Sequence, residues 1–298
     1  MVMRVATFSQ SSTILQNALQ TQAKLAKNQE QQASGYLSGD YAGLGSSAVT
    51  LVDLEVSVAR SQASVDVAED ALARVEMTYS VLGGISDVLT SMRANTTAIL
   101  TEDDLTGLQT VAASYLEDVA ALLNTQLAGR YIFAGSNTQE APVDLEAYQG
   151  DNLTDVNTDY YTGDDYEQSV RLNSDRTIDY GVTADADAIE EAMRALSYAA
   201  TADPLTMDDL ETLSDLLVGA QDGVIALQSI ASTAAASLES FISTEQDYIA
   251  TAGEMITDIS SADVAQLIVE ASNYEVQLEA SYAALGSLSD ISVLDYLF

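Results

Sequence analysis

The chain has 298 residues, of which 46 are acidic and 10 basic, so its formal net charge is −36. It has no cysteine, no histidine, no tryptophan and only two prolines. These absences exclude disulfides, Ser-His-Asp or Cys-His catalysis and ordinary zinc sites. Its acidity disfavours nucleic acid and anionic membranes as partners, because both are themselves negatively charged.

The composition favours long helices packed side by side. Aromatic residues make up only 6% of the chain although hydrophobic residues make up 47%, and alanine supplies much of that fraction. No run approaches 18 uninterrupted apolar residues, so we expect no transmembrane helix. The first residues hold no apolar run of signal-peptide length, so export would not use that signal.

The first predicted helix covers residues 14–33 and has a weak apolar seam. We expect it to be frayed or disordered in the isolated chain and to order on assembly, because half of its heptad positions are glutamine. The predicted seam consists of Leu15, Ala18, Gln22, Leu25, Gln29 and Gln32.

A stronger heptad seam follows over residues 51–82 and is typical of a long packed helix. Gly83 and Gly84 are predicted to bend or loosen this helix. Thr101 and Asp104 resemble a capping box in front of a further helical run over residues 105–122. The 51–82 seam comprises Leu51, Leu54, Val58, Ser61, Val65, Ala68, Leu72, Val75, Tyr79 and Leu82.

Residues 129–204 differ in character and are predicted to form a small α+β insert. The two prolines lie near its ends, at Pro142 and Pro204. Rough alternation over residues 166–182 predicts a β-hairpin, and residues 186–199 predict a short helix with Asp185 as its cap.

The C-terminal part carries the longest seam, which needs a partner along its whole length. Ser260 and Asp263 lie where its phase slips and are predicted to start a new helix. The seam before the slip comprises Val224, Leu227, Ala231, Ala234, Leu238, Phe241, Glu245, Tyr248, Ala252, Met255 and Ile259. The seam after it comprises Val264, Leu267, Ala271, Tyr274, Leu278, Ser281, Leu285 and Leu288.

The predicted fold is therefore mainly α. The N- and C-terminal arms form a long antiparallel coiled-coil-like rod, and the small α+β insert lies in the middle of the chain. The predicted parts are residues 1–45 with 260–298 as terminal axial helices, 46–128 with 205–259 as the rod, and 129–204 as the insert. We expect the terminal helices to be partly disordered in the isolated chain and to order on assembly.

Four stretches resemble the bacterial flagellin superfamily, and most of all its hook-associated protein type 3. Residues 33–45, ASGYLSGDYAGLG, are similar to the loop after the first helix of that family. Residues 124–135, NTQLAGRYIFAG, resemble its "NT…GxYLFxG" stretch, and residues 174–184 are similar as well. The tail from Tyr274 to Leu297 resembles "YxxxLQASxxA…SLLDYL".

The resemblance implies a structural protein of the flagellum that joins hook to filament outside the cell. It implies export by the flagellar type III system, self-association into a ring, and contacts with a neighbouring hook-associated protein, with flagellin and with an export chaperone. There are two alternatives. The first is a flagellin that forms the filament itself, and the second is a helical adhesin or enzyme on a similar scaffold.

The residues expected to act are packing residues. For the rod they are Leu51, Leu54, Val58, Val65, Leu72, Val75, Val224, Leu227, Leu238, Phe241 and Tyr248. For assembly and chaperone docking they are Val264, Leu267, Tyr274, Leu278, Leu285, Leu288, Leu294 and Tyr296.

Other motifs favour structural roles, and we expect no enzymatic activity, cofactor or metal. The glycines of residues 39–45 lack the Lys-Ser/Thr of a phosphate loop. Asp155, Asn157 and Asp159 begin like a calcium loop, but Tyr160 stands where that loop needs glycine. Adjacent acid pairs such as Asp208-Asp209 are interpreted as helix starts rather than as a glycosidase pair.

The charge is unevenly distributed along the chain. Residues 1–29 carry three bases and no acid, whereas no base follows Arg194. We expect the oppositely charged ends to help the terminal helices associate, although exposed ion pairs contribute only about 0–1 kcal/mol each.

Overall fold

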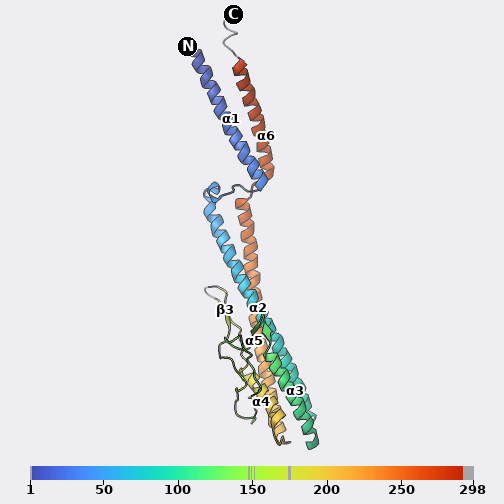
Figure 1. Cartoon of the computed structure of the whole chain (residues 1–298). Coiled ribbons are helices and arrows are strands. Elements are labelled where there is room, and N and C mark those ends of the chain that lie inside the picture. The colour runs from blue at the N-terminus through green and yellow to red at the C-terminus, as the bar shows by residue number, and fades with distance from the viewer. Residues whose placement is uncertain (1, 147, 149, 151, 174–175, 291–298) are drawn as a thin grey trace. The chain divides into compact units, whose positions relative to one another are not determined.

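The computed structural model describes residues 2–146, 148, 150, 152–173 and 176–290. Its elements follow one another as α1 (Val2–Ser34), the 3-10 helix η1 (Tyr41–Leu44), α2 (Ser47–Thr97), η2 (Glu102–Asp104), α3 (Leu105–Leu123), β1 (Gln126–Leu127), β2 (Arg130–Tyr131), β3 (Ser169–Arg171), β4 (Thr177–Asp179), α4 (Asp187–Thr201), α5 (Asp209–Ser260) and α6 (Val264–Asp290). Figure 1 shows these elements along the chain. The prediction of a mainly α fold with a small α+β insert is confirmed.

The chain divides into two compact units. One comprises Met1–Arg60 with Tyr248–Phe298, and the other comprises Ser61–Asp247. Both boundaries fall inside long helices, α2 and α5, which the sequence assigns to a single rod.

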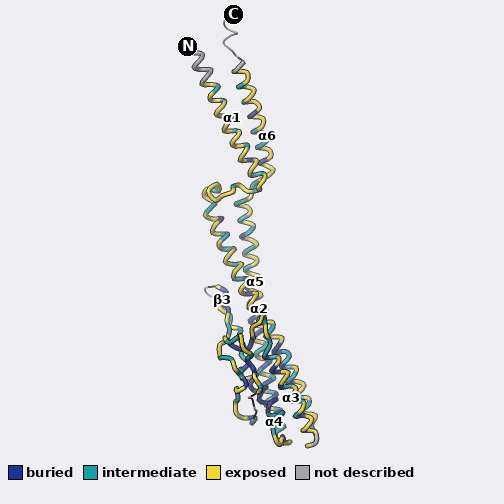
Figure 2. The backbone as a smooth tube through the Cα atoms, in the orientation of Figure 1, coloured by how far each residue is buried: buried dark blue, intermediate teal, exposed yellow. Residues whose placement is uncertain are grey.

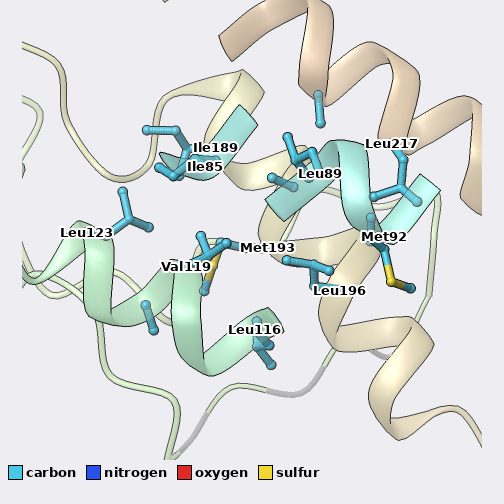
Figure 3. Close-up of a cluster of buried hydrophobic side chains, with 14 of the residues drawn as sticks. Ile85, Leu89, Met92, Leu116, Val119, Leu123, Ile189, Met193, Leu196 and Leu217 are labelled. Atoms are coloured by element: carbon cyan, nitrogen blue, oxygen red, sulfur yellow. The ribbon is translucent and has the colours of Figure 1, made fainter. Parts of the chain in front are cut away.

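The larger unit contains the hydrophobic core. α2, α3, α4 and α5 each turn one apolar face inward, and the buried residues gather around these helices (Figures 2 and 3). Apolar side chains on one face of a helix are removed from water together when that face packs. Burying each large side chain favours folding by about 1.5–3 kcal/mol. Fully buried members include Leu82, Ile85, Leu89, Met92, Val119, Leu123, Ile189, Met193, Leu196, Leu213, Leu217 and Val224.

Hydrogen bonds join the two halves of the predicted rod within this unit. Gln221 of α5 donates from Nε2 to Thr90 Oγ1 of α2 at 2.8 Å and accepts a bond from Arg93. Further along, Gln228 Nε2 donates to the carbonyl oxygen of Tyr79 at 3.4 Å. The N- and C-terminal arms therefore pack on each other here, as the paired seams predict.

The glycine pair of α2 does not end or interrupt the helix. α2 is one continuous helix through Gly83 and Gly84, and the predicted bend or loosening at this pair stays a prediction. A Cβ on Gly84 would lie 3.2 Å from Leu122 of α3, and one on Gly83 would lie 3.3 Å from Gln228 of α5. Because these glycines have no side chain, α3 and α5 can pack closely against α2 at this point.

Small residues also bring α4 and α5 together. A Cβ on Gly223 would lie only 2.5 Å from the Cβ of Ala188, a distance that van der Waals repulsion forbids. Gly107 of α3 differs, because nothing lies within 4 Å of the corresponding position.

The insert contains the predicted hairpin and a second, smaller one. β3 pairs antiparallel with β4, and the predicted short helix is α4. β1 pairs antiparallel with β2 through Ala128 and Gly129, which both have positive φ. Two positive φ values in a two-residue loop are typical of a type I′ hairpin.

The helix starts predicted at Thr101 and at Asp263 are confirmed, whereas the cap predicted at Asp185 is wrong. α4 begins at Asp187 with Ala186 as its N-cap, and no side chain caps it. Thr101 and Asp104 form a capping box in which the Thr101 N–H donates to Asp104 Oδ2 at 3.1 Å. The same hydrogen bonds, with that from the Thr101 hydroxyl first, lower the pKa of the Asp104 carboxyl. At the phase slip, α5 ends at Ser260 and Asp263 accepts the N–H of Gln266 at 3.0 Å in front of α6.

One described helix is long and apolar enough to cross a membrane by length and composition. It is α5, whose best window has a mean hydropathy of 1.2. Its first part supplies Leu213, Leu217 and Val224 to the core, and a core helix can pass the same test. The expectation that the chain has no transmembrane helix stays a prediction.

Candidate assembly surface

The terminal helices α1 and α6 pair with each other in the smaller unit. They lie side by side with the two chain ends at the same end of the pair (Figure 1). Gln32, near the end of α1, bonds the backbone of Leu267, near the start of α6, so the pair is antiparallel.

The contact between these helices is narrow and made largely of small or polar residues. On α1 only Ala18 and Asn28 are buried among the described side chains, and on α6 only Leu267 and Leu278 are. Half-buried residues complete the seam: Ile14, Thr21, Leu25 and Gln32 on α1, and Ala271, Tyr274, Ser281, Leu285 and Leu288 on α6.

A polar network lies within this seam. Gln32 Nε2 donates to Asn28 Oδ1 at 2.5 Å and to the Leu267 carbonyl oxygen at 3.1 Å. Asn28 is 3% exposed and its Nδ2 has no hydrogen-bond partner. A buried polar group left unsatisfied costs about 1–3 kcal/mol, and a lone Asn in an apolar seam can fix its register.

The seam on α1 follows a neighbouring row of the one predicted. Ala18, Leu25 and Gln32 face α6 as predicted. Leu15, Gln22 and Gln29 are exposed, and the adjacent Ile14, Thr21 and Asn28 take the inward positions, which corrects that part of the prediction. The two rows are about 100° apart on a helix, and Gln-rich sequence does not distinguish them.

Several large apolar side chains of the pair remain exposed. Leu15 and Leu19 of α1 are 49% and 56% exposed. On α6 the predicted assembly residue Val264 is exposed rather than packed, and so are Ile268, Val269, Val276 and Tyr282. Figure 2 shows how little of α1 and α6 is buried. The other predicted assembly residues on α6, Leu267, Tyr274, Leu278, Leu285 and Leu288, belong to the seam, and Leu294 and Tyr296 lie outside the described residues.

The chain passes from terminal helices to rod helices through a bonded joint. Tyr36 and Ser261 form an antiparallel bridge, in which Leu37 N–H donates to the Ser260 carbonyl oxygen at 2.8 Å. Ala262 N–H donates to the Gly35 carbonyl oxygen at 2.9 Å. The loop 35–46 is therefore tied to the α5–α6 connection rather than free.

The predicted rod residues lie mostly inward. Leu51, Val65, Val75, Val224, Leu238 and Phe241 are buried, and Leu54, Val58, Leu72 and Leu227 are half-buried. Tyr248 is the exception, with 41% exposure, because Ile249 and Ala252 take the inward positions of α5. An α-helix has 3.6 residues per turn, so a strict 3.5-residue repeat drifts off the contact line and Tyr248 ends beside it.

A buried ion pair and two buried tyrosines lie in the insert. Arg194 donates to both carboxylate oxygens of Glu190, at 2.9 and 3.0 Å, and also bonds the Leu153 carbonyl oxygen. Nearby, Tyr148 and Tyr160 meet edge to face, and burial raises the pKa of both phenols. Among the described residues, no three His, Cys, Asp or Glu side chains are arranged to hold a metal ion.

The comparisons with known proteins agree with the resemblance predicted from the sequence. Residues 5–138 match the model of the bacterial flagellin N-terminal helical region. No curated protein matches the chain in sequence.

Three solved structures are similar in fold. A structure assigned to the flagellar hook-associated proteins of Vibrio parahaemolyticus has a TM-score of 0.60 and 16% identity over 74% of this chain and 99% of its own. FlgL of Bacillus cereus has a TM-score of 0.48 and 17% identity over 72% and 98%. Hook-associated protein 3 of Legionella pneumophila has a TM-score of 0.45 and 11% identity over 70% and 97%. The match over residues 5–138 confirms the predicted resemblance to the flagellin superfamily, and the fold is similar to that of a solved hook-associated protein.

Proposed function

We propose that this chain is a structural subunit of the bacterial flagellum that joins the hook to the filament. The flagellin-type N-terminal region supports a flagellar role, and the fold shared with a hook-associated protein favours the junction over the filament. In this proposal the chain is exported by the flagellar type III system and works outside the cell.

The observation that carries the proposal is the incomplete core of the α1–α6 pair. Leu15, Leu19, Ile268, Val269 and Val276 are each about half exposed or more. Burying a large apolar side chain completely is worth about 1.5–3 kcal/mol, so covering the exposed halves of these five would add about 4–8 kcal/mol. Neighbouring subunits that supply further helices would bury these faces and order the ends in one step.

This proposal gives each predicted part of the chain a role. Residues 1–45 and 260–298 form the inner part of a ring, residues 46–128 and 205–259 form the rod, and residues 129–204 face outward. The chain contacts copies of itself, a neighbouring hook-associated protein and flagellin. It acts by packing, without enzymatic activity or a cofactor.

An export chaperone is part of the proposal and has a structural consequence. Leu278, Leu285 and Leu288 of α6 would be its docking residues, yet Leu278 is packed against α1. The chaperone therefore competes with α1 for one face of α6. Release of the chaperone after export frees that face for α1.

Deleting the gene in its own organism tests the proposed function. We expect cells that retain hooks but shed unpolymerised flagellin into the medium, and restoration by a plasmid copy. Cells with attached filaments after the deletion would refute the junction role.

The family model is that of a flagellin region, so filament formation is the second candidate. Seeding the purified chain onto filament fragments separates the two. A junction protein stops after a short addition, whereas extended filaments would establish a flagellin.

A further inference from the structure

The charges of the terminal helices are not matched within one chain. α1 carries both lysines of the protein, Lys24 and Lys27, whereas α6 contains acids and no base. The uneven charge distribution along the chain predicts that these charges help α1 and α6 associate. In the described part of the chain, however, neither lysine forms an ion pair with α6, because Lys24 lies beside the uncharged Gln277, Ala280 and Ser281.

The α1–α6 pair has two unlike sides. On α1, Lys24 and Lys27 lie about 80–140° to one side of the seam, and Leu15 and Leu19 lie about 100–140° to the other. The lysine side is also lined by Asn17, Gln20 and Gln277, so we call it the basic side.

The opposite side combines acids with apolar residues. Glu275 and Glu279 of α6 lie about 80–120° from its seam, away from Gln277. Ile268 and Tyr282 lie on the same side, and all four are exposed. We call the surface of Leu15, Leu19, Ile268, Glu275, Glu279 and Tyr282 the acidic side.

The lysines of α1 and the glutamates of α6 lie at the same axial position along the α1–α6 pair. Lys24 is beside Gln277 and Ser281, and Glu275 and Glu279 flank Gln277 in the same stretch of α6. A second copy placed alongside without axial displacement would therefore bring its lysines to the level of these glutamates.

We propose that the basic side of one copy docks on the acidic side of the next copy. The occupant is a second copy of this chain, because the charges on the two sides are complementary and no base on α6 competes for the acids. The contact buries Leu15, Leu19 and Tyr282 and pairs Lys24 and Lys27 with Glu275 and Glu279. This inference rests on the proposed function and names the surface that mediates assembly.

The contact is heterologous, since it joins two different surfaces. Such a contact leaves one free basic side and one free acidic side after each addition, so it produces a ring or a helical array rather than a closed two-fold dimer. Exposed ion pairs contribute at most about five-fold each in affinity, so the charges mainly select the register, and the apolar residues supply most of the binding.

Engineered disulfides test the contact, because the natural chain has no cysteine. Lys24→Cys/Glu275→Cys places the two thiols on opposite sides of one pair, where an intrachain disulfide cannot form, since its Cα atoms must lie within about 7 Å. After oxidation at about 1 mM, where a contact with a millimolar Kd is half-populated, we expect a ladder of dimers, trimers and larger species on a non-reducing gel.

Matched controls distinguish disulfides formed by random collision from disulfides formed in the proposed contact. Each single variant, Lys24→Cys or Glu275→Cys, is expected to remain monomeric, and an equal mixture of the two is expected to stop at dimers. Lys24→Cys/Gln277→Cys has both thiols on the basic side and is expected to give no ladder. Dimers of Lys24→Cys alone, or no ladder from the double variant, would overturn the proposal.

Charge exchange provides an independent measurement by sedimentation. Lys24→Glu/Lys27→Glu and Glu275→Lys/Glu279→Lys are each expected to lower self-association at least several-fold while retaining native helix content. Mixing the two variants restores association, since each then offers the side that the other lacks. Association of either variant alone at the natural level, or no recovery on mixing, would refute the pairing.

These outcomes are separable from the proposed function. A deletion strain that sheds flagellin, together with an absent ladder, would overturn this contact and leave the junction role intact. Filaments that stay attached in the deletion strain would refute the junction role whatever the gels show.

Discussion

Replacing Arg194 by Met is the substitution for which the structure predicts the largest loss of stability. Arg194 and Glu190 are 5% and 2% exposed, and three hydrogen bonds join them. Glu190 Oε1 also accepts the N–H of Asn157 at 2.8 Å, so the pair holds the insert on α4. Removing the cation leaves a buried carboxylate uncompensated, which costs about 3–5 kcal/mol.

The measurement is thermal unfolding, monitored by near-ultraviolet circular dichroism of the tyrosines. For a unit of this size about 1 kcal/mol corresponds to about 2–4 °C, so Arg194→Met is expected to lower Tm by about 6–20 °C. Arg130→Met removes an exposed arginine and is the control, with an expected change within about 0.5 kcal/mol. A loss below about 1 kcal/mol for Arg194→Met would refute the reasoning.

Three further predictions concern packing and capping. Gly223→Ala is expected to be destabilising, since overpacking costs about 1–3 kcal/mol whereas the better helix propensity of alanine contributes only about 1 kcal/mol. Gly107→Ala, which has free space around it, is expected to stabilise by about 0.5–1 kcal/mol. Thermal melts compare the two variants, and equal Tm shifts would contradict the packing argument. The lowered pKa of Asp104 implies that its capping contribution is complete above the unfolded pKa of about 4 and is lost as the pH falls through the folded pKa. The protection factors of the amides at the start of α3, which are corrected for intrinsic exchange, are expected to fall in that window. A Thr101→Val variant showing the natural pH dependence would contradict this. Asn28→Leu removes an unsatisfied amide and is expected to slow amide exchange in α1 by about five-fold, equivalent to about 1 kcal/mol, and faster exchange would refute the assigned burial cost.

Heptad spacing predicts the helical architecture well because packing in long helices is repetitive. The capping box at Thr101 and the helix start after Asp263 depend on local hydrogen bonds, so short motifs predict them. The hairpin of β3 and β4 is likewise indicated by local alternation.

The failures have a common physical origin in the geometry of neighbouring elements. Tyr248 and the α1 row from Leu15 are misplaced because adjacent rows of a helix are nearly equivalent until a partner selects one. The packing role of Gly83 and Gly84 is not predicted from the sequence, because their closeness to α5 and α3 exists only in the folded unit.

The polar network of the candidate surface is also invisible in sequence. Asn28 and Gln32 are two members of a Gln-rich run, and nothing there distinguishes the buried amide from exposed ones. The pairing of Arg194 with Glu190 has the i,i+4 spacing of an exposed helix pair, so its burial depends on the insert that covers it.

The central claim is that the incomplete α1–α6 pair assembles this chain into a junction between hook and filament. Electron cryomicroscopy of filaments isolated with their hooks attached tests it most directly. The account predicts a short ring of this chain between hook and filament, with α1 and α6 packed against those of neighbouring copies. Density for this chain along the whole filament, or none at the junction, would contradict it.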